Sequence, residues 1–165
     1  MKKLLTIILL FVCIFAKAQT IEQIIGYYNE QHNYLSGIIN QIRQSIDDEH
    51  IQLYKMTDNP QRATKMALLR YLRNYTRLLK ADIVVSKAEI NDLKKYKATY
   101  PGKNTLVVNE GIAKHNERIR ICSQEVSELT KSFNQRLKEY VSIYGNNYSK
   151  IFAEDDAELT KLGIP

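Results

Sequence analysis

Proline, glycine and cysteine are scarce in this 165-residue chain, which has 3 prolines, 6 glycines, 2 cysteines and no tryptophan. So few helix-breaking residues leave room for long uninterrupted helices. Cys13 lies in an N-terminal apolar run that we expect to be removed, which leaves Cys122 alone. A single cysteine excludes an internal disulfide, so packing has to hold the fold together. We expect Cys122 to be a buried, inert thiol, because it falls on the apolar side of its segment.

The sequence also lacks the short motifs that mark common catalytic sites. It contains no glycine-rich phosphate loop, no nucleophile elbow and no paired histidine–carboxylate motif. A ferritin-like di-metal bundle needs Glu-x-x-His on two helices, but Asp47 stands three residues before His50 and Ile112 stands three before His115. We therefore predict a protein that is not an enzyme and that carries no cofactor.

Residues 1–18 have the order of a secretory signal peptide. Two lysines precede an apolar run from Leu4 to Ala16, and a small-x-small cleavage site ends at Ala18. The run has 13 residues, whereas a helix needs about 20 to cross a bilayer. We expect cleavage after Ala18 and a periplasmic or secreted location in a Gram-negative bacterium. The alternative is an uncleaved N-terminal anchor.

Proline, glycine and asparagine cluster at three predicted corners. At the first corner, Asn59 has the character of an N-cap and Pro60 that of a first helical residue. Tyr100-Pro101-Gly102 forms the second corner, and a helix stop at Gly145 forms the third. The corners separate three segments of similar length.

Within each segment the apolar residues recur at alternating steps of three and four, the period that keeps one helix stripe facing a partner. These stripes run from Ile21 to Met56, from Leu69 to Leu93 and from Val108 to Ile143. Equal helices joined by short corners predict an all-α fold: an elongated, coiled-coil-like, antiparallel up-down-up three-helix bundle over residues 19–145. We expect the acidic tail, residues 146–165, to be a short helix docked weakly on the bundle or to be partly disordered.

Polar residues interrupt the stripes at two levels. Folding the segments at the corners places His32, Ser86 and His115 at one level, and Glu49 beside Arg136 at another. The pattern favours a structural polar layer that fixes register, and an ion pair that sets orientation. A metal or proton-switch site at His32 and His115 is the alternative, because imidazoles bind metals and titrate near neutrality.

One basic column stands out on the second segment. Arg73, Lys80, Lys87 and Lys94 recur every seven residues and face no compensating charge on the third segment. Such a column can bind another protein or an anionic surface, although a solvated flank explains it as well. Removal of the signal peptide leaves 21 basic and 18 acidic residues, a net charge of +3. We therefore expect no nucleic-acid partner.

These observations suggest a non-enzymatic exported protein that acts through protein–protein interaction. One setting for it is an envelope secretion or conjugation assembly, a suggestion that rests on analogy with other exported helical proteins. The alternatives are a periplasmic holdase-type chaperone and a metal- or pH-responsive binder that uses His32 and His115. A heptad stripe can also be buried between two chains, so the sequence does not decide whether the protein forms an oligomer.

Overall fold

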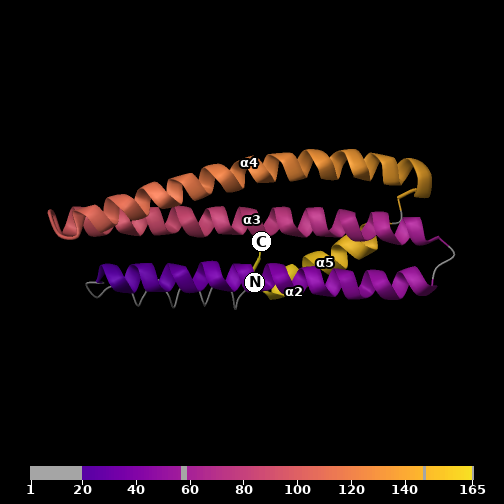
Figure 1. Cartoon of the computed structure of the whole chain (residues 1–165), viewed down its shortest axis with the longest axis horizontal. Helices are drawn as coiled ribbons and strands as arrows, with labels where there is room; N and C mark the ends of the chain where they lie inside the picture. Colours follow the sequence, from indigo (N-terminus) through magenta and orange to yellow (C-terminus); the bar gives the residue numbers. More distant parts are fainter. Residues whose placement is uncertain (1–19, 57–58, 147, 165) are drawn as a thin grey trace.

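The computed structural model of the chain describes residues 20–56, 59–146 and 148–164, which contain four α-helices and no strand. The helices are α2 (Ile21–Met56), α3 (Pro60–Thr99), α4 (Thr105–Tyr144) and α5 (Ser149–Lys161). The first three run antiparallel as an elongated bundle, and α5 follows as a short C-terminal helix (Figure 1). The predicted all-α three-helix bundle is thus confirmed. The predicted signal peptide lies outside the described residues.

Local sequence signals place each helix boundary where it is. The Asn59 side chain accepts a hydrogen bond from the backbone N–H of Arg62 at 3.1 Å, which makes Asn59 the N-cap of α3. The turn between α3 and α4 uses positive φ angles at Gly102 and Asn104, of 82° and 49°. Gly145, with φ of 76°, ends α4. All three predicted corners therefore lie at helix ends.

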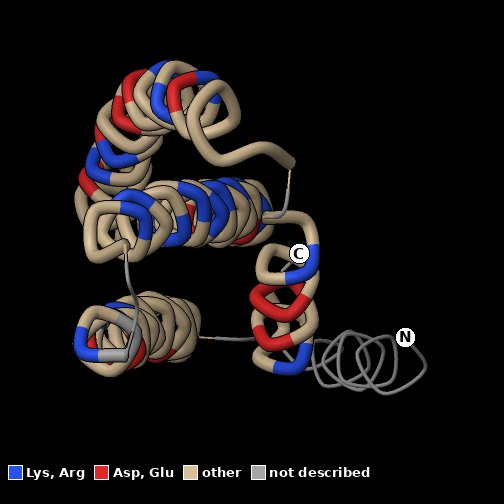
Figure 2. Tube along the Cα trace, turned by 90° about the vertical axis from the view of Figure 1, so that its right-hand side faces the viewer, with Lys and Arg blue, Asp and Glu red and all other residues tan. Residues whose placement is uncertain are grey.

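The central helix of the bundle is α3, which packs against α2, α4 and α5. Viewed along the bundle, α3 lies between α4 and α2, and α5 stands to one side (Figure 2). A central helix has to bury two flanks, whereas each outer helix buries one stripe. None of the described helices combines the length and the apolar character needed to span a lipid bilayer.

The acidic tail forms α5, and this helix packs on the bundle. Phe152 packs in a cluster with Met66, Leu69 and Tyr140, and Leu159 packs in another with residues of α2 and α3. Arginines of α3 bind its carboxylates: Arg70 Nη2 lies 2.7 Å from Asp155 Oδ1, and Arg73 Nη2 donates to Asp156 Oδ2 at 2.8 Å. Apolar burial and charge pairing together hold α5 in place.

Candidate functional site

His32 and His115 meet inside the bundle, although they come from its two outer helices. Their rings are stacked, with centroids 5.5 Å apart and an interplanar angle of 9°. Both side chains are buried, and Ser86 on α3 is fully buried. Ser86 lies at their level, because the residues four before and three after it on α3, Asp82 and Glu89, both contact His32. The structure therefore brings the three predicted residues of this layer together.

Two carboxylates of α3 complete the layer, and the sequence analysis missed both. Asp82 Oδ1 lies 2.7 Å from His32 Nδ1. Glu89 Oε2 lies 2.9 Å from His115 Nε2 and 3.5 Å from His32 Nε2. We refer to Asp82, Glu89, His32 and His115, with Ser86, as the histidine–carboxylate cluster. With the two buried carboxylates, the layer is a charged site and not a neutral polar one.

Asp82 is the anchored anion of the cluster. Arg118 binds it with two hydrogen bonds, Nε to Oδ2 at 2.7 Å and Nη2 to Oδ1 at 2.9 Å. Burial opposes ionisation of Asp82, but His32 and Arg118 outweigh that effect and lower its pKa to about 2. An ionised carboxylate can only accept hydrogen bonds, so His32 Nδ1 carries the proton. The other ring nitrogen, Nε2, is then directed toward Glu89.

Burial and charge act against each other at His32 and at Glu89. Burial disfavours the cationic form of His32, yet Asp82 and Glu89 raise its pKa above the usual value. Burial disfavours the Glu89 anion too, yet His115 and His32 hold the pKa of Glu89 below its usual value. Near neutral pH the cluster therefore contains two carboxylate anions.

Several buried polar atoms of the cluster have no hydrogen-bond partner among the described residues. These atoms are His32 Nε2, Glu89 Oε2, His115 Nδ1 and Ser86 Oγ. The Glu89 Oε2–His115 Nε2 contact has ion-pair distance but not hydrogen-bond geometry. Buried polar groups in proteins are nearly always paired, and each unpaired one costs about 1–3 kcal/mol. These four buried atoms are therefore available to bind a further group.

Cys122 borders the cluster as a buried thiol. Its Sγ donates to Asp82 Oδ2 at 3.6 Å, and its side chain is buried. Burial, with the nearby Asp82 anion, raises the pKa of Cys122. A nucleophilic cysteine needs the opposite shift, so these contacts support an inert thiol.

The predicted pair of Glu49 with Arg136 is wrong. Glu49 instead forms an ion pair with Arg70 of α3, and Arg136 is exposed and donates to Ser132 of its own helix at 3.3 Å. The prediction assumed that α2 and α4 face each other along their whole length. Instead, α3 lies between the two outer helices (Figure 2), and at this level its Arg70 binds Glu49.

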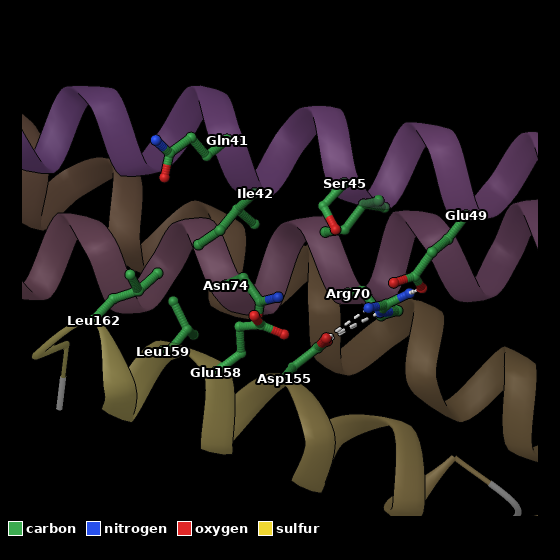
Figure 3. A pocket seen from close by; sticks show the side chains of 11 residues that line it. Gln41, Ile42, Ser45, Glu49, Arg70, Asn74, Asp155, Glu158, Leu159 and Leu162 are labelled. Carbon is green, nitrogen blue, oxygen red and sulfur yellow. Dashed lines mark hydrogen bonds and ion pairs between the residues drawn. The ribbon is translucent and has the colours of Figure 1, made fainter.

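Glu49 and Arg70 line a small pocket between α2, α3 and α5, with a volume of about 200 Å³. Figure 3 shows Arg70 reaching from α3 to Asp155 on α5 and to Glu49 on α2. Asn74 also lines it, and its buried side-chain oxygen has no hydrogen-bond partner among the described residues. Arg70 already binds both carboxylates, but its single positive charge balances only one of them, and Glu158 also lines the pocket.

The basic column divides into two parts. Arg73 binds Asp156 and lies over the Phe152 ring, 5.1 Å from its centroid, so α5 already occupies it. Lys80, Lys87 and Lys94 are exposed and have no hydrogen bond or ion pair with the described residues. Of the four residues of the column, these three lysines are therefore the ones that a partner can reach.

A signal for Asp82 and Glu89 was present in the sequence. The second segment is basic overall, yet Asp82, Glu89 and Asp92 recur at steps of seven and three, on one side of a helix. In the structure Asp92 accepts a hydrogen bond from Tyr28 at 2.7 Å. Acidic residues that repeat on one side of a basic helix indicate a second buried flank. Comparisons with protein-family models, with curated proteins and with solved structures found no match for this chain.

Proposed function

We propose that this chain is an exported, non-enzymatic helical protein that acts by binding another protein through the lysine face of α3. We define the lysine face as Lys80, Val84, Lys87 and Lys94. Its lysines are exposed, and Val84 is 62% exposed at its centre. Steps of four, three and seven place the four residues on one side of the helix. This uncompensated face is the observation that carries the proposal.

The chemistry of the lysine face fits an acidic protein surface with an apolar contact in its middle. From Lys80 to Lys94 the face extends about 21 Å along the helix, which is the scale of a small protein contact. Positive charges at the edge of a contact attract an acidic partner and orient it. The apolar side chain between them can be desolvated when the partner binds.

A charge-reversal experiment tests this proposal. The double variant Lys80→Glu/Lys87→Glu should lose the partner that the wild-type chain co-purifies from exported fractions of its host. The matched control, Lys131→Glu/Lys138→Glu, reverses two exposed lysines at the same spacing on α4 and should keep it. Far-UV circular dichroism should be equal for all three proteins. Equal partner recovery with both variants would reject the lysine face as the binding surface.

A holdase-type chaperone is the second candidate function, and the apolar side chains that α4 exposes favour it. Leu106, Ile121 and Ile143 are 70%, 50% and 58% exposed. They are spread along the helix, and single exposed apolar residues are common on protein surfaces. The lysine face is therefore the stronger candidate. Suppression of aggregation of an unfolded outer-membrane protein, equal for wild type and Lys80→Glu/Lys87→Glu, would favour the chaperone instead.

A further inference from the structure

Three helices each direct one metal-ligating side chain to the same buried point. His32 comes from α2, Glu89 from α3 and His115 from α4, and one ligand atom of each lies within 4.8 Å of the others. Their side chains are 8%, 2% and 5% exposed. Tetrahedral ligands about 2.0–2.1 Å from a zinc ion lie about 3.3 Å from one another. Glu89 Oε2 lies 2.9 Å from His115 Nε2 and 3.5 Å from His32 Nε2, on either side of that value.

The hydrogen bonds among the described residues leave two of these ligand atoms and one neighbouring hydroxyl unused. His32 Nε2 and Glu89 Oε2 have no hydrogen-bond partner among the described residues, and neither has Ser86 Oγ one turn before Glu89. A cation at the centre would bind the first two. Asp82 and Glu89 together carry two negative charges, Arg118 supplies one positive charge, and the second comes either from a proton on His32 or from a bound cation. The cluster therefore attracts positive charge.

An outer layer orients His32 for this role. Asp82 accepts the Nδ1 proton of His32 at 2.7 Å, and Arg118 fixes Asp82 with two hydrogen bonds. Metal-binding histidines usually donate their second ring N–H to a carboxylate in this way, which leaves the other nitrogen free to bind metal. Asp82 is a positioning residue here, because it acts on the metal through His32.

We propose that His32, Glu89 and His115 bind one divalent transition-metal ion, with Zn²⁺ as the best match, and that this ion joins the three long helices near the end of the bundle where α3 turns into α4. Two imidazoles and one carboxylate are a ligand set that zinc commonly uses. All three side chains are buried, so the ion would lie inside the bundle, with three of the four ligands that zinc usually takes supplied by the chain. The site is separate from the lysine face and goes beyond the protein-binding function.

Titration of the EDTA-treated full chain with Zn²⁺ in a calorimeter tests this site. We expect one ion per chain and a raised melting temperature, because binding only to the folded state stabilises it. Glu89→Gln should weaken binding by more than about 100-fold, and Asp82→Asn by about 10- to 100-fold, as an outer-layer change does. His50→Gln is the matched control, since it removes the third histidine, which bonds Thr64 at 3.0 Å, and should leave binding unchanged.

Spectroscopy on the wild-type chain keeps the proposal testable if a variant does not fold. Zn²⁺ should shift ring ¹⁵N resonances of His32 and His115 and leave those of His50 in place. Co²⁺ should give a spectrum without a thiolate charge-transfer band, because Cys122 is not a ligand. No zinc binding, unchanged binding by Glu89→Gln, or shifts centred on His50 would overturn the proposal.

Discussion

Replacing Leu159 with alanine tests whether α5 is an integral part of the bundle. Leu159 is 1% exposed and packs with Leu35, Ile38 and Leu78. Truncating a fully buried leucine removes apolar contacts and leaves a cavity, at a cost of about 2–5 kcal/mol. If that cost falls on the docking of α5 alone, the state in which α5 is detached from the bundle becomes about 30-fold to several thousand-fold more populated.

Hydrogen exchange followed by mass spectrometry measures this change directly. Peptides covering residues 149–161 should lose protection in Leu159→Ala by that factor, and the urea midpoint of the whole chain should fall or stay equal. Thr160→Ala is the control, because Thr160 is the adjacent exposed residue of the same helix. Unchanged protection in Leu159→Ala would refute the reasoning that burial of this side chain holds α5 on the bundle.

Two further predictions concern the cap of α3 and the charges that hold α5. Asn59→Ala should lower the free energy of unfolding by about 1 kcal/mol in urea titrations, because the N–H of Arg62 loses its side-chain acceptor. Asn59→Asp keeps that acceptor and should stay near wild type; equal losses in both variants would argue against the cap. Arg73, with Arg77 beside it, lowers the pKa of Asp156. The ionised side chain therefore stabilises the fold at pH values above the unfolded-state pKa of about 3.9, and this contribution is lost as pH falls through the lower pKa of the folded state. The difference in urea midpoint between wild type and Asp156→Asn should therefore be constant near neutral pH and shrink below about pH 4; a difference that does not change on acidification would show that the ion pair contributes nothing.

The sequence predicted the architecture because the signals for it are local and repeated. Apolar steps of three and four define each stripe, and the residues around Pro60, Pro101 and Gly145 define the corners. Helices of similar length that turn back at such corners can align in few ways. The meeting of His32 with His115 followed from that alignment alone.

Contacts that depend on how the helices share neighbours could not be predicted from the sequence. One stripe per helix is enough for α2 and α4, but α3 buries two flanks, and so Asp82 and Glu89 were assigned to no stripe. The pairing of Glu49 with Arg136 failed because α3 lies between the outer helices and supplies Arg70 as the partner of Glu49. The periodicity within a helix does not reveal which neighbour covers each of its sides.

The account depends most on the convergence of three helices around one metal position. Crystals of the full chain grown with Zn²⁺, with diffraction data collected on both sides of the zinc absorption edge, measure this directly. We expect one anomalous peak per chain, enclosed by His32, Glu89 and His115. A peak at His50 or elsewhere on the surface, or no peak inside the bundle, would contradict the account.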